Sequence, residues 1–116
     1  MLFICYPRCS TCQKAKQWLE TKGVAFEQRH IVDENPSYEE LSKWYALSGL
    51  PIKKLFNTSG KLYKEMQLKD QLKTMSDEEC LKLLATNGML VKRPLMILEN
   101  KVLVGFKVEE WEANIQ

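Results

Sequence analysis

The sequence has no feature that would tie the protein to a membrane, a secretory route or nucleic acid. No apolar run approaches the ~18 residues that a membrane-spanning helix needs. The apolar run at residues 1–5 is not preceded by basic residues and is far shorter than the hydrophobic core of a signal peptide. The net charge of +2 is too small to require nucleic acid or an anionic membrane as a partner. We therefore expect a cytoplasmic protein with neither as a direct partner.

Histidine is nearly missing, which limits the metal chemistry available to the chain. A zinc site takes about four ligands. Besides Cys9 and Cys12, the chain offers only Cys5, Cys80 and His30, with no second Cys-x-x-Cys and no histidine pair. Nor does any Cys and His arrangement suggest a cysteine protease. We expect no bound metal or cofactor, with His30 a surface or core residue.

Length and composition describe an ordinary globular domain. The chain has 116 residues, of which 45% are hydrophobic and 28% charged, and it contains no repeat, low-complexity tract or linker. A chain of this length can bury a core without disulfides or metal. We predict one domain over residues 1–116.

The first third of the chain has the pattern of a βαβ unit. Residues 2–5 form a short apolar run, typical of a buried parallel strand. The apolar positions in residues 10–22 recur on one helical face, and Gly23 is a natural helix terminator. Residues 24–32 return to an extended pattern. Short connections between these elements favour a parallel strand pair joined by the helix.

The remaining pattern is a helical block followed by a hairpin and a last helix. Two capping boxes, at residues 37–40 and 76–79, each predict the start of a helix, the second helix running to Gly88. Between them, residues 52–75 suggest several short helices. Residues 94–98 and 102–104 have the pattern of a β-hairpin, and residues 109–112 that of a helix start. The predicted fold is α/β and thioredoxin-like, with a mixed sheet (βαβ … ββα) and an all-helical insertion at about 37–88.

The spacing of Cys9 and Cys12, between the first strand and the first helix, predicts redox chemistry. Unpaired N–H groups and the positive dipole end at a helix N-terminus stabilise an anion, and the thiolate is the reactive form of cysteine. The preceding Arg8 would add positive charge. Cys9 is therefore predicted to attack, and Cys12, one turn further in, to resolve a mixed disulfide at Cys9.

Other roles for the cysteines remain open at this point. Cys9 and Cys12 could also be half of a zinc site, or structural cysteines that pack in the core. Cys5 and Cys80 lie on apolar faces, which is typical of small core residues.

The segment Lys92-Arg93-Pro94 is the second informative stretch. A proline that enters the third strand of a thioredoxin-type fold is where a cis bond is expected. Arg93 would then face the Cys9 turn as a fixed cation for a thiolate or an oxyanion. The alternative is an ordinary surface arginine before an edge-strand proline.

These motifs together resemble the arsenate reductase family. The resemblance rests on Cys9-Ser10-Thr11-Cys12, the helical insertion, Arg93-Pro94-Leu95 and Val104-Gly105-Phe106, and it spans the chain. That family includes glutaredoxin-coupled arsenate reductases and Spx-type redox-sensing regulators that bind RNA polymerase. The resemblance implies a thioredoxin-like fold, a nucleophilic Cys9 and Arg93 beside a cis Pro94.

Two positions depart from the family pattern. Arsenate reductases of this type use two further arginines to hold the oxyanion, in segments where this chain has Asn57 and Phe106. Lys53, Lys54 and Lys107 are near these positions in the sequence. Fewer bidentate arginine contacts would weaken the binding of arsenate. The arsenate enzymes also commonly have no second cysteine at this spacing, whereas Spx-type proteins do.

We therefore predict a cytosolic thiol-disulfide oxidoreductase of this family. Arsenate reduction coupled to glutathione and glutaredoxin is one candidate activity. Its substrate would be a small oxyanion or a disulfide, with glutaredoxin or thioredoxin as reductant and glutathione as a candidate co-substrate. The alternatives are an Spx-like regulator that binds RNA polymerase and, third, a plain binding module. The predicted catalytic residues are Cys9, Cys12 and Arg93, and the predicted substrate-binding residues are Arg8, Ser10, Thr11 and Pro94.

Overall fold

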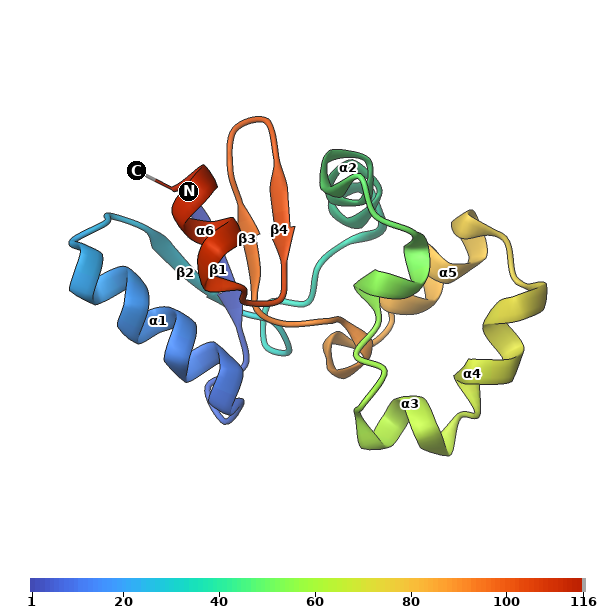
Figure 1. Cartoon of the computed structure of the whole chain (residues 1–116). Helices are drawn as coiled ribbons and strands as arrows, with labels where there is room; N and C mark the ends of the chain where they lie inside the picture. Colours follow the sequence, from blue (N-terminus) through green and yellow to red (C-terminus); the bar gives the residue numbers. More distant parts are fainter. Residues whose placement is uncertain (116) are drawn as a thin grey trace.

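A mixed β-sheet forms the centre of the molecule (Figure 1). The computed structural model describes residues 1–115. Within that range the sheet has the strand order β2-β1-β3-β4. Its strands are β1 (Leu2–Cys5), β2 (Glu27–His30), β3 (Leu95–Ile97) and β4 (Val102–Val104). β1 pairs in parallel with β2, whereas the β1–β3 and β3–β4 pairs are antiparallel. The predicted α/β mixed sheet is confirmed.

The helix of the βαβ unit begins and ends where the sequence predicts. α1 covers Ser10–Lys22, and Gly23 ends it in the left-handed region at φ 70°. Glycine adopts this conformation readily because it has no Cβ atom, whereas other residues are sterically strained in it. β2 is shorter than the extended segment predicted over residues 24–32. Val24 and Phe26 lie outside the strand but pack, partly buried, against the α1 side of the sheet.

Side chains alternate across the sheet and so create two hydrophobic cores. Phe3 and Cys5 face α1 and α6 (Val108–Asn114), whereas Ile4 between them faces the other side. Figure 1 shows α1 and α6 on one side of the strands, and α2 (Tyr38–Ser48) and α5 (Asp77–Leu84) on the other. The Cys9–Cys12 turn therefore belongs to the first layer, and the helical insertion forms the second.

Between β2 and β3, every element assigned in the described chain is helical. Besides α2 and α5, they are η1 (Ile52–Leu55), α3 (Lys61–Glu65), α4 (Leu68–Gln71), η2 (Leu72–Thr74) and η3 (Gly88–Leu90). Both predicted capping boxes are present: Ser37 with Glu40 begins α2, and Ser76 with Glu79 begins α5. Each box satisfies two backbone N–H groups at a helix start.

α5 ends earlier than its sequence pattern predicts. Its last residue is Leu84, with Ala85 as the cap, so the predicted helix end at Gly88 is wrong. Gly88 has a different role, because a Cβ atom there would collide with the carbonyl oxygen of Ile31. The glycine permits close approach of the insertion to the segment that follows β2.

The insertion is attached to the chain just before β3 by backbone hydrogen bonds. Phe56 and Val91 form an isolated antiparallel bridge. The Asn57 N–H donates to the Leu90 carbonyl at 2.8 Å, and the Lys92 N–H donates to the Leu55 carbonyl at 2.8 Å. These bonds place η1 beside the segment that leads to Arg93 and β3. In the described chain, no helix has the length and apolar character to cross a membrane.

Candidate functional site

The turn between β1 and α1 holds Cys9 at the helix N-terminus. Cys9 is the N-cap residue of α1, with extended backbone angles (φ −83°, ψ 122°) and no side-chain capping bond. Its N–H donates to the Tyr6 carbonyl at 2.9 Å, and its own carbonyl accepts from the Gln13 N–H at 3.0 Å. The Gln13 side-chain amide donates to the Pro7 carbonyl at 2.9 Å. The turn is therefore fixed by bonds that leave the Cys9 sulfur free to accept others.

The surroundings of Cys9 favour its thiolate. Its burial acts to raise the pKa, but hydrogen bonds from the backbone and thiol of Cys12, the backbone of Thr11 and the side chain of Arg93 lower it below the ordinary value. The bonds outweigh the burial because each donor stabilises the charged sulfur directly. Cys9 is also partly exposed, so a substrate can reach it. These are the properties of an attacking thiol.

Cys12 has the opposite character. It is buried, and that burial, with the charge of Cys9 beside it, raises the pKa of Cys12 to about 12 despite a hydrogen bond from the Tyr6 backbone. The Tyr6 N–H lies 3.4 Å from the Cys12 sulfur. Cys12 is thus a neutral thiol that donates to the Cys9 sulfur.

Arg93 and Pro94 stand beside this turn, as the sequence predicted. The Arg93–Pro94 peptide bond is cis. The Arg93 guanidinium lies 5.1 Å from the centre of the Tyr6 ring, and its Nη1 donates to the Met89 carbonyl at 3.2 Å. It is partly buried and reaches the Cys9 sulfur, so it is not an ordinary surface arginine.

The other predicted site residues occupy the same corner with different exposure. Arg8, Ser10 and Thr11 are exposed on the turn and the first turn of α1, whereas Pro94 is buried. Thr11 also lines a pocket next to the turn. Their predicted role in binding substrate remains a prediction.

The two remaining cysteines are core residues, as predicted. Cys5 is 3% and Cys80 is 0% exposed. Burial raises the pKa of both thiols, and for Cys80 the nearby Asp77 and Glu79 add to the effect. Both are therefore poor nucleophiles. In the part of the chain that the structure describes, no three His, Cys, Asp or Glu side chains gather as a metal site requires.

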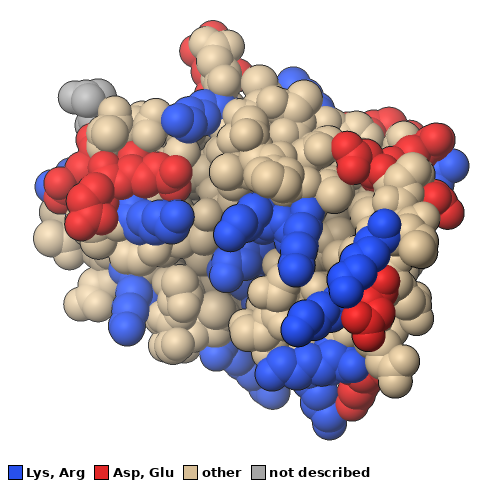
Figure 2. Space-filling model, turned by 45° about the vertical axis from the view of Figure 1, so that its right-hand side comes forward, with Lys and Arg blue, Asp and Glu red and all other residues tan. Residues whose placement is uncertain are grey.

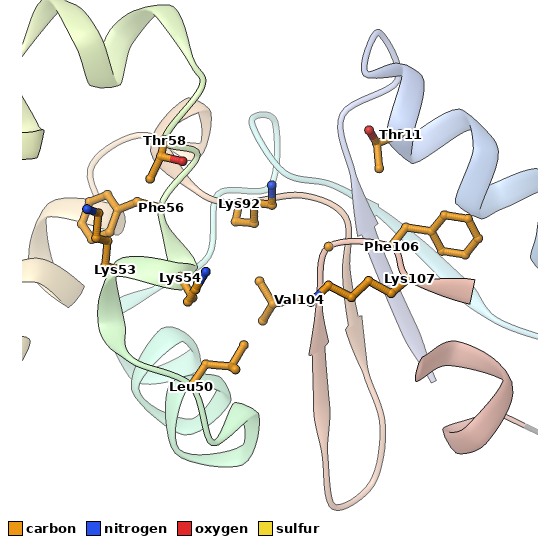
Figure 3. A pocket seen from close by; sticks show the side chains of 11 residues that line it. Thr11, Leu50, Lys53, Lys54, Phe56, Thr58, Lys92, Val104, Phe106 and Lys107 are labelled. Atoms are coloured by element: carbon orange, nitrogen blue, oxygen red, sulfur yellow. The ribbon is translucent and has the colours of Figure 1, made fainter. Parts of the chain in front are cut away.

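A pocket of about 490 Å³ lies between the sheet layer and the insertion (Figure 3). Lys53 and Lys54 come from η1, Lys92 from the segment before β3, and Lys107 from the segment after β4. Figure 3 shows Lys54 and Lys107 on opposite walls of this pocket. Lys and Arg side chains also gather near the middle of the face in Figure 2, with most acidic side chains toward its edges.

The pocket joins the two segments in which the sequence departs from the arsenate reductase pattern. Phe56 and Thr58 flank Asn57 on one wall, and Phe106 with Lys107 forms the other. Lysines therefore lie close in sequence to both positions where arginines were expected. Sequence reasoning named all four lysines, Lys92 only as part of the Arg93-Pro94 segment, but did not predict that they surround one cavity. One signal was available: neither Lys53, Lys54 nor Lys92 has an acid three or four residues away.

Comparisons with known proteins agree with this fold. The family model described as ArsC family matches residues 5–114. The uncharacterised protein YusI of Bacillus subtilis (strain 168) is 51% identical over 114 residues, covering 98% of this chain and 97% of that protein. The regulatory protein MgsR of the same organism is 30% identical over 110 residues, covering 95% of this chain and 86% of that protein.

A solved structure from Bacteroides fragilis, described as ArsC family related, is 61% identical to this chain. It covers 97% of this chain and 94% of its own, with a TM-score of 0.95. The family match spans nearly the whole chain, and the protein belongs to the ArsC family.

Proposed function

We propose that this ArsC-family protein is a cytosolic thiol-disulfide oxidoreductase with Cys9 as nucleophile and Cys12 as resolving thiol. The observation that carries the proposal is the unequal pair one helical turn apart. Cys9 is partly exposed with a lowered pKa, whereas Cys12 is buried with a pKa raised to about 12. A nucleophile needs the thiolate form and access, and a resolving thiol needs protection from outside reagents.

In the first step, the Cys9 thiolate attacks one sulfur of a disulfide substrate. A bond forms between Cys9 and that sulfur, the substrate S–S bond breaks, and the other half leaves as a thiolate. Arg93 supports this step as a cation beside the reacting sulfur.

In the second step, Cys12 loses its proton and attacks the Cys9 sulfur. This forms the Cys9–Cys12 disulfide and releases the second half of the substrate, so the substrate gains two electrons and the cysteine pair loses two. Part of what raises the Cys12 pKa is the charge on Cys9. That charge disappears once Cys9 is in a mixed disulfide, so Cys12 becomes easier to deprotonate when it is needed.

A dithiol protein such as glutaredoxin or thioredoxin would reduce the Cys9–Cys12 disulfide and complete the cycle. Glutathione is a candidate co-substrate that could resolve the Cys9 adduct in place of Cys12. Both reactions are ordinary thiol-disulfide exchange and need no bound cofactor.

The test is to trap the intermediate with matched variants. Treatment of Cys12→Ser with a small disulfide should leave one stable adduct at Cys9, found by peptide mass spectrometry. The wild-type protein should instead form a Cys9–Cys12 disulfide, and Cys9→Ser should form neither. Adducts on Cys5 or Cys80 in place of Cys9 would refute the proposal.

Arsenate is a candidate substrate within the same mechanism, because the Cys9 thiolate could attack the oxyanion with Arg93 beside it. The positions of Asn57 and Phe106 carry no arginine, so we expect weak turnover. An assay with arsenate, glutathione and glutaredoxin decides this. Turnover no greater than that of Cys9→Ser would remove arsenate as a substrate.

A second candidate function is redox-sensing regulation through RNA polymerase. The observation that favours it is the 30% identity to a protein described as regulatory, together with a cysteine pair able to switch between dithiol and disulfide. Pull-down of RNA polymerase from a cell lysate tests it. Capture that differs between the reduced and oxidised protein supports regulation, and no capture in either state rejects it.

A further inference from the structure

We propose that the pocket beside the Cys9 turn selects small organic disulfides that carry several negative charges. This inference rests on the proposed function and names its substrate class. The lysine pocket, defined by Lys53, Lys54, Lys92 and Lys107, brings positive charge from three chain segments to one cavity. The other residues that line it are neutral.

The charge of the lysine pocket is not neutralised by the protein. Within residues 1–115, none of its four lysines forms an ion pair with a carboxylate. Some lysines elsewhere in the described chain are paired: Lys61 lies 3.7 Å from Glu65, and Lys82 lies 3.2 Å from Glu78. What distinguishes the pocket is that four unpaired lysines gather around one cavity that no acidic side chain among the described residues lines, so their charge is available to a ligand. Clefts lined by one sign of charge concentrate ligands of the opposite sign.

The size of the cavity favours an organic ligand over a bare oxyanion. Its volume is about 490 Å³. Small-molecule sites commonly have ~300–1,000 Å³, and a water molecule occupies about 30 Å³. A tetrahedral oxyanion, with only a few heavy atoms, would fill a small part of this space. A molecule with a carbon skeleton would fill it better.

The arrangement of the cations points to anionic groups that are spread over the ligand. Arginine presents a planar fork that holds one carboxylate or oxyanion through two bonds, whereas lysine is a point charge on a flexible stem. Lys54 and Lys107 approach from opposite walls, with Lys92 between the walls (Figure 3). Separate point charges suit separate carboxylates or phosphates. Leu50, Phe56, Val104 and Phe106 supply apolar surface for the carbon skeleton.

Thr11 connects the lysine pocket to the reacting thiol. Its side chain lines the pocket, and its backbone N–H donates to the Cys9 sulfur. Gly105 lies on the pocket wall with φ 78°, a backbone conformation that favours glycine. A ligand held by the lysines therefore has its disulfide near the Cys9 turn. Cys9 attacks one sulfur, and the remaining half leaves as an anionic thiolate within the positive field.

The experiment compares disulfides that differ in charge. Cystamine is cationic, bis(2-hydroxyethyl) disulfide is neutral and 3,3′-dithiodipropionate is dianionic. The rate of Cys9 adduct formation is measured for each in Cys12→Ser and divided by the rate with 2-mercaptoethanol, which removes differences in intrinsic reactivity. We expect the dianion to exceed the neutral compound by about tenfold and the preference to fall with added salt.

Variants assign the preference to the lysine pocket. In the same Cys12→Ser background, Lys54→Gln with Lys107→Gln should bring the ratio of dianion to neutral rate close to one. Lys61→Gln with Lys73→Gln removes the same charge from exposed lysines that pair with Glu65 and Asp70. This control should keep the ratio.

Two failures are distinguishable. Equal normalised rates for all three disulfides, with the adduct still on Cys9, would overturn the charge selection and leave the proposed function intact. An equal fall of the ratio in both double variants would also overturn the charge selection by the pocket, because general net charge would then explain the preference. No Cys9 adduct with any of the disulfides would overturn the proposed function itself.

Discussion

The Cys9 turn and the lysine pocket are built in different ways. The turn is made by residues adjacent in sequence, 6–13, held by three local hydrogen bonds around Cys9 and Pro7. The pocket is assembled from α1, the insertion, the approach to β3 and the segment after β4. In the proposed function, the local part carries the chemistry and the dispersed part selects the substrate. We therefore predict that reactivity and selectivity can be altered separately.

Replacement of Cys9 by serine should have the largest effect, because it removes the nucleophile while leaving the lysine pocket unchanged. We expect Cys9→Ser to lose disulfide reductase activity by at least ~10³-fold. A coupled assay with thioredoxin or glutaredoxin measures it. Residual activity within tenfold of wild type would mean that another thiol performs the reaction.

Replacement of Cys12 by serine should separate the two steps. Turnover should fall by about 10²-fold, and the Cys9 adduct should accumulate because nothing inside the protein resolves it. The Cys12 thiol also lowers the Cys9 pKa, so the pH at which Cys9 becomes reactive should rise in this variant. Glutathione should restore part of the turnover only if it can resolve the adduct from outside.

Replacement of Arg93 should lower reactivity at Cys9 by a smaller amount. Arg93→Gln removes one of several donors to the sulfur, so the Cys9 pKa should rise and the rate near neutral pH should fall by about tenfold. Arg93→Lys keeps the charge and should recover part of the loss. Alkylation rates of Cys9 over a pH series distinguish the two variants. Identical pH profiles for wild type, Arg93→Gln and Arg93→Lys would exclude a role for Arg93 at the site.

The Arg29–Glu40 pair is a charge pair that serves the fold, in contrast to the open charges of the lysine pocket. Arg29 donates to both Glu40 oxygens at 2.6 and 2.9 Å, and these bonds lower the pKa of Glu40 to about 2. The pair therefore stabilises the fold fully above the pKa of Glu40 in the unfolded chain, about 4.3, and this stabilisation is lost as the pH falls toward 2. Because the pair is partly exposed, Glu40→Gln should cost about 1 kcal/mol at pH 7.

Urea unfolding of wild type and Glu40→Gln at pH 7 and pH 3 measures this effect. The difference between the two proteins should shrink at the lower pH, while reductase activity at pH 7 should stay within twofold. A difference that is equal at both pH values would mean that the Glu40 charge is not the source of stability.

The sequence could predict the Cys9 turn and several helix boundaries because their signals are local. Helix caps at Ser37 and Ser76, the terminator Gly23 and the Cys-x-x-Cys depend on neighbours within a few residues. The lysine pocket depends on contacts between distant segments, such as the bridge from Phe56 to Val91. No local pattern fixes such contacts.

The errors have the same origin. The sequence pattern favoured a helix up to Gly88, but α5 ends at Leu84. Gly88 instead packs against the Ile31 backbone, a contact between distant segments that the local pattern does not predict. The proximity of Arg93 to Cys9 was available only through resemblance to a fold, since the two residues are far apart in sequence. Tertiary packing, and not local preference, decides both.

The most direct test of the assigned thiol roles is the reactivity of Cys9 as a function of pH. Iodoacetamide labelling of the reduced protein, followed by peptide mass spectrometry, reports each thiol separately. We predict that Cys9 reacts with a midpoint below the ordinary thiol pKa of about 8.5, while buried Cys12 reacts far more slowly. A Cys9 midpoint at or above that value, or faster labelling of Cys12, would contradict the assignment of attacking and resolving thiols.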